Sequence, residues 1–473
     1  MQSEAIVGVT ILELTIHGAG QTVTGSLFQV TTKNVSFLVD CGLFQGNREK
    51  QYERNHRFDF NPKEIDFVVL THAHLDHCGR LPMLVRGGFR GPIFATSASA
   101  ELCSLLLRDV GESEEEDASR DRLIHGQSDK TAPLFTVRDA NRTVKQFSIV
   151  EYNTKKMLPG EVTLRFRDAG HILGSSIAET WIEENGRIVH LVDTGDVGRK
   201  NAPIIRDPDF PSAAPYLLCE STYANRSHEP LERTIRRFER VIIKANRHQS
   251  HILVPAFAIG RTQALIYALN SLVEKGKVPI IPVAIDSPLA IKATEIFKRH
   301  RECFDEEMWE LIESGDAPLD FKGLQYVERQ YDSDTLSQQR GPLMIVAGSG
   351  MMNGGRILRH LYRRIEDRNT RLLVIGFQAP GTLGHRIVHG ARQVRIYGRT
   401  KRVRATLERL YGFSAHADQT ELTNFFASLR RQPPQHVFAV HGSPKACQGL
   451  VRIVKQTLGC PVTAPRVGQK FRL

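Results

Sequence analysis

The chain has 473 residues, which is long for one domain and predicts two or three. Its 63 Lys and Arg outnumber 52 Asp and Glu, so the formal net charge is +11, and this excess favours a polyanionic partner such as nucleic acid. No stretch approaches the roughly 18 apolar residues of a membrane span, and no secretory signal pattern is evident at the first residues. The seven cysteines are scattered and odd in number, as is typical of reduced thiols, so we expect a cytoplasmic protein.

The first 200 residues alternate short apolar segments with polar turns, which predicts strands. The expected strands are 7–14, 26–30, 36–39, 65–70, 93–95, 162–166 and 188–192, with helices near 98–110 and 138–147. After about residue 205, expected strands 252–254, 283–285, 343–347 and 372–375 alternate with expected helices 261–275, 289–299 and 355–365. This alternation predicts a parallel sheet with crossover helices, and short strands return near residue 394.

The expected strand 65–70 leads into a cluster of metal-binding residue types. The run from Thr71 to His77 reads Thr-His-Ala-His-Leu-Asp-His and holds three imidazoles and one carboxylate. Such groups are costly to bury unless they are paired or bind a metal. His72 and His74 are two positions apart, so their rings aim the same way, while Asp76 and His77 can face a second centre. The sequence therefore predicts a metal site with two centres.

Three more of the expected strands, and a further apolar segment at 437–440, lead into a polar residue. They deliver Asp40, His171, Asp196 and His441, each beside a glycine or within a few residues of one. Taken singly, each is an ordinary turn residue. Together with the cluster after residue 71, they supply enough nitrogen and oxygen ligands for two zinc-like ions.

These motifs resemble the metallo-β-lactamase fold, and the segment between the last two resembles its β-CASP branch of nucleases. The β-CASP signals lie at 220–223, 255–263, 286–290, 348–351, 354–360, 381–385 and 412–418. The likeness covers about residues 10 to 445 and looks closest to short prokaryotic RNA nucleases, relatives of the pre-mRNA 3′-end cleavage endonuclease. It implies an α/β fold, a metallo-β-lactamase αββα sandwich at 1–208 and 394–473. An α/β β-CASP domain, a parallel sheet with crossover helices, would be inserted at 209–393.

The resemblance also implies a ligand set for two Zn²⁺ ions. His72, His74 and His171 would hold one ion, Asp76, His77 and His441 the other, and Asp196 would bridge them. Asp76 counts among the catalytic residues, as does Asp40, a carboxylate that orients the cluster. Two such ions about 3.5–4 Å apart activate water and stabilise an in-line displacement at phosphorus. Manganese or iron suits the same ligands under other conditions.

Glu220, His385 and His416 match the three signature positions of the branch. The resemblance implies that both histidines contact the scissile phosphate. His416, polarised by Glu220, would donate a proton to the leaving oxygen. A histidine at position 416 is typical of RNA-directed members, whereas DNA-repair members carry valine there.

Further phosphate contacts are expected in the same branch. His360 is a second candidate for the role of His385, and Ser349 and Gly350 lie in a loop whose backbone N–H groups suit a phosphate.

The favoured function is a zinc-dependent ribonuclease acting on single-stranded RNA in RNA processing or decay, mainly endonucleolytic with some 5′–3′ exonuclease activity. A small-molecule metallo-hydrolase of the same fold is one alternative. An enzyme with a small substrate would not need an arginine-rich inserted domain, which argues against it. A non-catalytic scaffold in RNA processing is another, although such proteins lose ligands and here all are present. A DNA nuclease is the remaining alternative, and a homodimer or RNA-processing partner proteins stay open.

Overall fold

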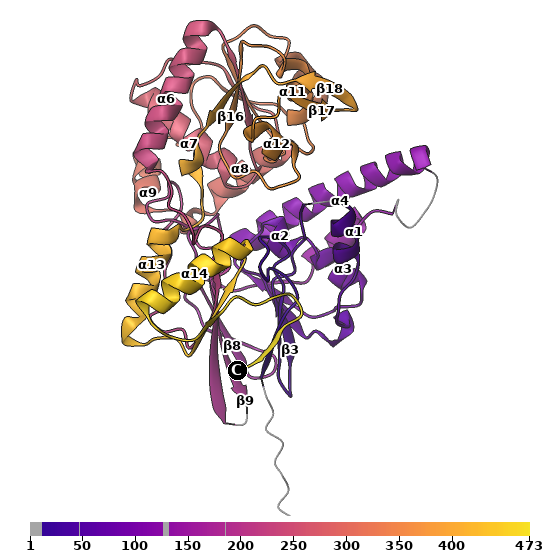
Figure 1. Ribbon diagram of the computed structural model, residues 1–473, viewed down its shortest axis with the longest axis vertical. Coiled ribbons are helices and arrows are strands. Elements are labelled where there is room, and N and C mark those ends of the chain that lie inside the picture. The colour runs from indigo at the N-terminus through magenta and orange to yellow at the C-terminus, as the bar shows by residue number, and fades with distance from the viewer. Residues whose placement is uncertain (1–11, 47, 126–131, 185) are drawn as a thin grey trace, which may run out of the picture. The chain divides into compact units, whose positions relative to one another are not determined.

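The computed structural model in Figure 1 describes residues 12–46, 48–125, 132–184 and 186–473. The chain forms two compact units. The first contains the described residues up to Lys200 together with Asp207–Ser227 and His416–Leu473, and the second contains Asn201–Arg206 and His228–Ala415. The second unit is therefore inserted into the first. Within the described ranges, no helix combines the length and the hydropathy needed to cross a bilayer.

The first unit is built on two seven-stranded sheets. One has the order β22-β1-β2-β3-β4-β5-β6 and the other β21-β20-β11-β10-β9-β8-β7. The strands of the first sheet are β1 (Glu13–Ile16), β2 (Phe28–Thr31), β3 (Ser36–Val39), β4 (Phe67–Val69), β5 (Ile93–Ala95), β6 (Phe147–Ile149) and β22 (Lys470–Arg472). Those of the second are β7 (Lys156–Leu158), β8 (Val162–Asp168), β9 (Ser176–Glu184), β10 (Arg187–Asp193), β11 (Tyr216–Glu220), β20 (His436–Val440) and β21 (Val462–Thr463).

One apolar core fills the space between these sheets. It joins Phe37 and Phe67 of the first sheet to Phe166 and Phe438 of the second. A second core packs the helices α13 and α14 on the outer side of the second sheet. Figure 1 shows those helices on one side of the sandwich and α3 and α4 on the other. The helices are α1 (Arg48–His56), α2 (Leu75–Cys78), α3 (Leu81–Arg86), α4 (Ser97–His125), α5 (Val137–Val144), α13 (Gln419–Ser428) and α14 (Pro444–Thr457). The predicted αββα sandwich is confirmed.

The second unit is a six-stranded sheet of order β14-β13-β15-β12-β16-β19, in which every pair of neighbours is parallel. Its strands are β12 (His251–Pro255), β13 (Val283–Ile285), β14 (Leu324–Tyr326), β15 (Leu343–Ala347), β16 (Thr370–Val374) and β19 (Thr406–Arg409). Its helices are α6 (Leu231–His248), α7 (Arg261–Glu274), α8 (Pro288–Arg299), α9 (Glu306–Glu313), α10 (Gln330–Leu336), α11 (Ile357–Arg364) and α12 (Leu383–Val388). A separate hairpin joins β17 (Gln393–Ile396) to β18 (Arg399–Arg402). The predicted parallel sheet with crossover helices is confirmed.

Several element boundaries differ from those predicted. Most of the expected strand 7–14 lies outside the described residues, and β1 runs on to Ile16. The expected helix 138–147 ends at Val144, because Phe147 begins β6 and pairs with β5. The second unit continues to Ala415, beyond the predicted end of the insertion at residue 393, because β19 pairs with β16 in its sheet.

Candidate metal centre

Two loops at the ends of neighbouring strands bring the first ligands together. The buried strand β4 ends at Val69, and the chain turns through His72 and His74 into the short helix α2. The adjacent strand β3 ends before Asp40 and Gly42. A Cβ atom at Gly42 would lie 1.6 Å from the backbone oxygen of Asp76. Glycine is therefore required at position 42 for these two loops to approach so closely.

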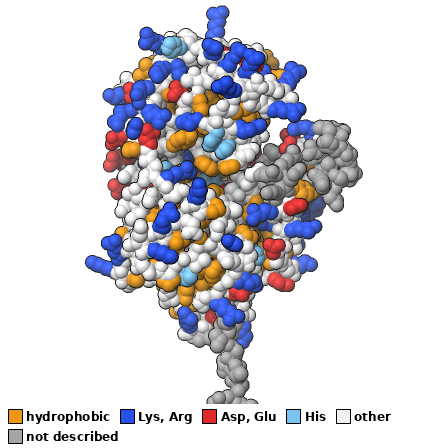
Figure 2. Space-filling model, in the orientation of Figure 1, with side chains coloured by type: hydrophobic (Ala, Val, Ile, Leu, Met, Phe, Trp, Pro, Cys, Tyr) orange, Lys and Arg blue, Asp and Glu red, His pale blue; other side chains and the backbone are white. Residues whose placement is uncertain are grey.

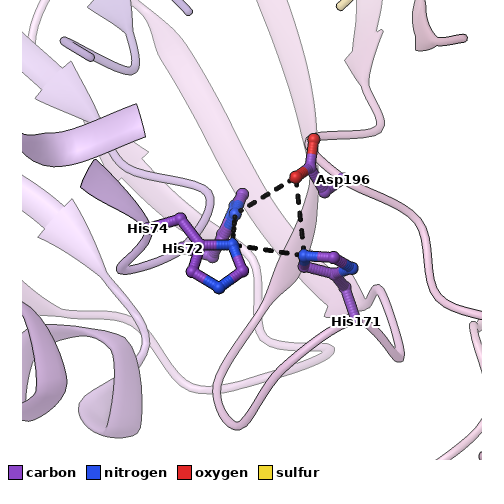
Figure 3. Close-up of side chains that lie close together, drawn as sticks. All are labelled: His72, His74, His171 and Asp196. Carbon is purple, nitrogen blue, oxygen red and sulfur yellow. Dashed lines mark hydrogen bonds and ion pairs between the residues drawn. The ribbon is translucent and has the colours of Figure 1, made fainter. Parts of the chain in front are cut away.

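Figure 3 shows the first group of ligand atoms, in which four side chains point toward one another. His74 Nδ1 lies 3.1 Å from His72 Nε2 and 3.3 Å from His171 Nε2. Asp196 Oδ2 lies 3.5 Å from His72 Nε2 and 3.4 Å from His171 Nε2. Four ligands bound to zinc at 2.0–2.1 Å form a tetrahedron with edges of about 3.3–3.4 Å. These four atoms therefore fit one tetrahedral ion.

The second group contains Asp76, His77 and His441. His441 Nε2 lies 3.2 Å from His77 Nε2 and 3.5 Å from Asp76 Oδ2. The other oxygen of Asp196, Oδ1, lies 3.3 Å from His77 Nε2 and 3.2 Å from His441 Nδ1. The two oxygens of Asp196 thus face different groups, as a bridging carboxylate requires.

A buried oxygen in this cluster needs a cation. Asp196 Oδ1 is buried and accepts no hydrogen bond of good geometry from the described residues, although His77 Nε2 and His441 Nδ1 lie 3.3 and 3.2 Å from it. A buried carboxylate oxygen without a donor is costly, and a metal ion beside it removes that cost. The donor set, its spacing and this orphaned oxygen all fit divalent metal at the cluster.

Two of the candidate histidine ligands and the carboxylate between the groups are held in the protonation states that metal binding needs. Burial, with the positive charge of His77, lowers the pKa of His72 to about 3. Burial likewise lowers the pKa of His74 to about 4, so both rings are neutral at pH 7. For Asp196, burial opposes ionisation, but the charges of His441 and His77 hold the pKa of its carboxyl well below the usual range. Neutral imidazole and ionised carboxylate are the metal-binding forms. Burial opposes charge on His77 and His441, but the carboxylate of Asp196 outweighs it and raises the pKa of both rings, so a metal would displace their protons.

Asp40 supports the cluster from behind. Its carboxylate is fully buried and accepts hydrogen bonds from the Thr71 backbone N–H at 2.8 Å and from the Thr71 hydroxyl. Its Oδ2 lies 2.6 Å from His77 Nδ1. When His77 donates from Nδ1 to Asp40, its Nε2 is left to face the metal. The sequence pattern gave no role to Thr71, although a hydroxyl directly beside the first histidine was a usable signal.

Glu220 and His416 form a pair beside the same cluster. His416 Nδ1 lies 2.9 Å from Glu220 Oε1 and 3.9 Å from Asp196 Oδ2. The Glu220 carboxylate is buried and also accepts hydrogen bonds from the backbone N–H groups of Val197 and Thr222. These two donors hold the carboxylate in place, so it fixes the orientation of the His416 ring.

The remaining predicted residues lie in the second unit. The imidazole of His385 is half-buried on α12 and stacks on His389, with ring centroids 3.9 Å apart. Ser349 already uses its polar groups locally, because its hydroxyl accepts from the Asn353 and Gly354 N–H groups and its own N–H donates to Gly354. At position 350, a Cβ atom would lie 2.7 Å from the Phe257 ring, so a side chain there would clash with this ring.

His360 has a different environment from the one expected. Its imidazole is fully buried, and its Nε2 lies 2.6 Å from Asp286 Oδ2. Asp286 also accepts hydrogen bonds from Arg356 and Ser333. The ring therefore belongs to a buried polar network of the second unit, and its burial corrects the prediction that it contacts a phosphate.

Three family models match the chain. They are the metallo-beta-lactamase superfamily at residues 23–89, the Beta-Casp domain at 262–387 and the Zn-dependent metallo-hydrolase RNA specificity domain at 400–465. The first match contains the cluster after residue 71, and the second lies within the second compact unit.

Comparisons of this chain with individual proteins give the same result as the family models. Ribonuclease TTHA0252 of Thermus thermophilus is 35% identical over 96% of this chain and 98% of its own length. Transcription termination factor FttA of Methanosarcina mazei is 30% identical over 94% of this chain and 69% of its own length. A crystal structure of a protein of unknown function from Enterococcus faecalis shares the fold, with a TM-score of 0.55 and 15% identity over 98% of this chain and 100% of that one. The chain belongs to the β-CASP ribonuclease family of the metallo-β-lactamase superfamily, and is a metal-dependent hydrolase.

Proposed function

We propose that the protein is a zinc-dependent ribonuclease that binds two zinc ions and cleaves single-stranded RNA, mainly at internal phosphodiester bonds. The observation that carries the proposal is the position of Asp196, whose two oxygens face two separate ligand groups at 3.2–3.5 Å. Between the two activities named for its relatives, we choose ribonuclease because the alignment spans 98% of that relative and 69% of the termination factor.

Two divalent ions, when bound, supply Lewis acidity for a displacement at phosphorus. The chain's own residues supply the rest of the chemistry. Asp40 holds His77 in one orientation, and Glu220 holds His416 through Nδ1. We assign proton donation to the leaving oxygen to His416, because an imidazole exchanges protons near neutral pH. His385, on α12 of the second unit, is assigned a contact with the substrate phosphate.

Zinc is the proposed metal because the first group has tetrahedral spacing and mixes three imidazoles with one carboxylate. Single-stranded RNA is the proposed substrate because cationic side chains are spread over the surface, as Figure 2 shows for one face. The hairpin of β17 and β18 is one such region, with the exposed side chains of Arg395, Arg399 and Arg402. A cationic surface binds the phosphate backbone.

The proposed compartment is the cytoplasm. None of the seven cysteines forms a disulfide in the described structure, and six of them are buried, which suits a reducing environment. That the protein forms a homodimer or binds other RNA-processing proteins stays a prediction.

The test is cleavage of a 5′-labelled single-stranded RNA and of its DNA counterpart, with chelator and with zinc added back. Internal RNA cuts that vanish with chelator and return with zinc are the expected result, with DNA cut much more slowly. His74→Ala, which removes one ligand, should abolish cleavage and leave RNA binding largely intact. His248→Ala, at an exposed position on α6, is the matched control.

Two outcomes would overturn the proposal. Uncut RNA, with two zinc ions per chain measured in the same sample, would favour a small-molecule hydrolase or a scaffold. Equal cleavage of DNA would remove the preference for RNA.

A further inference from the structure

A second site lies in the first unit, in a cavity of about 690 Å³. Aromatic and cationic side chains dominate its wall. The lining includes Phe44, Tyr52, Phe58, Phe60, Arg57 and Arg80. A volume of this size is within the range of small-molecule sites, and none of these residues belongs to the metal cluster.

The buried charge in this wall is Arg80. Its side chain is 2% exposed, and it forms no ion pair with any carboxylate among the residues that the structure describes. One guanidinium nitrogen donates to the backbone oxygen of Arg57, and the guanidinium lies over the Phe58 ring at 4.1 Å. Its Nε is buried without a hydrogen-bond partner. A buried cation without an anion is costly, so the position favours an anionic ligand.

A second orphaned nitrogen lines the same cavity. His56 Nδ1 donates to the Tyr52 backbone oxygen at 2.7 Å, and its Nε2 is buried with no partner among the described residues. The burial of Arg80 lowers the pKa of its guanidinium, and the charge of Asp59 opposes this shift without cancelling it. Two residues that line the cavity, Arg80 and His56, thus each have a buried nitrogen that the described residues leave without a hydrogen bond.

The wall also carries several aromatic rings that are tilted against one another. Phe60 lies 4.9 Å from His17 and 5.1 Å from Phe58, measured between ring centroids. Arg54 lies over the Phe44 ring at 4.2 Å. Aromatic rings and guanidinium planes are the groups on which nucleic-acid bases stack. The two carboxylates in the lining, Glu53 and Asp59, suit the exocyclic amine of a base.

We propose that this cavity binds a nucleotide, with its base among the aromatic rings and its phosphate at Arg80 and Arg57. The ligand is either a free nucleotide or one residue of an RNA chain, which share this chemistry. The site is separate from the metal cluster, so the proposal stands whether or not the protein cleaves RNA.

The test measures binding of the four nucleoside 5′-monophosphates, of inorganic phosphate and of a ten-residue RNA to the full chain by calorimetry. Every measurement is made in His74→Ala, which prevents cleavage, and the mononucleotides are also measured in the wild type. Arg57→Glu and Phe60→Ala should each weaken nucleotide binding by roughly 10-fold or more, the size of one lost stacking or phosphate contact. Arg142→Glu, an equal charge change at an exposed position on α5, should leave it unchanged. Inorganic phosphate alone should bind more weakly than a nucleotide.

The outcomes separate the two ligand sources. Binding of mononucleotides that depends on Arg57 indicates a free-nucleotide site, whereas binding of RNA alone with the same dependence indicates a substrate contact. Arg57→Glu tests the cavity without removing the buried Arg80, and circular dichroism checks that the variant is folded. The proposal is overturned if no probe binds at concentrations up to about 1 mM, roughly the weakest dissociation constant of a specific site, or if Arg57→Glu and Arg142→Glu bind equally well. It is also overturned if wild-type protein binds the nucleotide and His74→Ala does not, because the metal cluster would then be the site.

Discussion

Oδ2 of Asp40 lies 2.6 Å from Nδ1 of His77, and this contact sets which nitrogen of His77 faces the cluster. Asp40→Asn keeps the size of the side chain but weakens this contact. We expect zinc affinity to fall by about 10–100-fold, the usual effect of a lost hydrogen-bond partner behind a ligand, while the fold is retained. Competition with a fluorescent zinc chelator measures the change. Asp332→Asn, exposed on α10, is the control, and unchanged affinity in Asp40→Asn would refute this role.

The two ligand groups predict different zinc contents in different variants. His74→Ala removes a ligand of the first group, and His441→Ala removes one of the second. Each should retain about one zinc of the two in a buffer that holds free zinc low. Asp196→Ala should retain less than either, because its oxygens face both groups. Elemental analysis of the purified variants gives the count. Two zinc ions in His74→Ala would show that the first group is assigned wrongly.

His416 and Glu220 should act as a unit. His416→Ala is expected to slow single-turnover RNA cleavage by about 10²–10⁴-fold, the usual range for a general acid, with zinc content unchanged. Glu220→Gln should slow cleavage and shift the alkaline limb of the pH–rate profile, since a general acid must be protonated to act and the contact of Glu220 with His416 is lost. Adding Glu220→Gln to His416→Ala should cost little more, because Glu220 acts through the ring. Loss of zinc from His416→Ala would instead make His416 a ligand.

Much of the candidate metal centre could be proposed from the sequence because its candidate ligands lie in short motifs at strand ends. His72, His74, Asp76 and His77 come from one loop, so local spacing indicates them. That His441 belongs to the same site was inferred from the resemblance to a family. No local spacing in the sequence indicates a contact between residues so far apart in the chain.

His360 shows what the pattern missed and why. It lies three residues after Ile357 and directly before Leu361, and all three side chains are buried on one face of α11. The helical period already indicated this apolar face. Its partner Asp286 is 74 residues away, so no spacing in the sequence identifies it. The cavity at Arg80 was not predicted either, because its aromatic rings and charged side chains come from separate segments of the chain.

The β17–β18 hairpin should contribute to RNA binding. Arg399 and Arg402 are exposed, and the side chains of neither form an ion pair within the described part of the chain. The double variant Arg399→Glu and Arg402→Glu should weaken RNA binding and lower the salt slope by roughly 0.7 for each lost phosphate contact. Fluorescence anisotropy at several salt concentrations measures both. Lys244→Glu with Arg247→Glu on exposed α6 is the control pair, and equal slopes in the two double variants would exclude the hairpin.

Glu179 should stabilise the first unit in a pH-dependent way. Burial opposes ionisation of its carboxyl, but His190, Arg165 and Arg167 outweigh burial and lower the pKa of Glu179 to about 2 from about 4.5. Arg165 Nε and Arg167 Nε lie 2.6 and 2.8 Å from its Oε2. Because the folded pKa is the lower one, the contribution is complete above pH 4.5 and is lost as the pH falls toward 2.

Glu179→Gln removes the charge that this linkage needs. At pH 7 it should lower the free energy of unfolding by up to about 3 kcal/mol, which is the free energy linked to lowering the pKa of Glu179 from about 4.5 to about 2. Urea unfolding of wild type and variant, measured from pH 7 to pH 3, gives the difference at each pH, so effects of metal loss common to both cancel. The difference should be constant above about pH 5 and shrink below it. Glu183→Gln, exposed on the same strand, should show no such trend. A difference for Glu179→Gln that grows as the pH falls would mean that the carboxyl is not stabilised in its charged form.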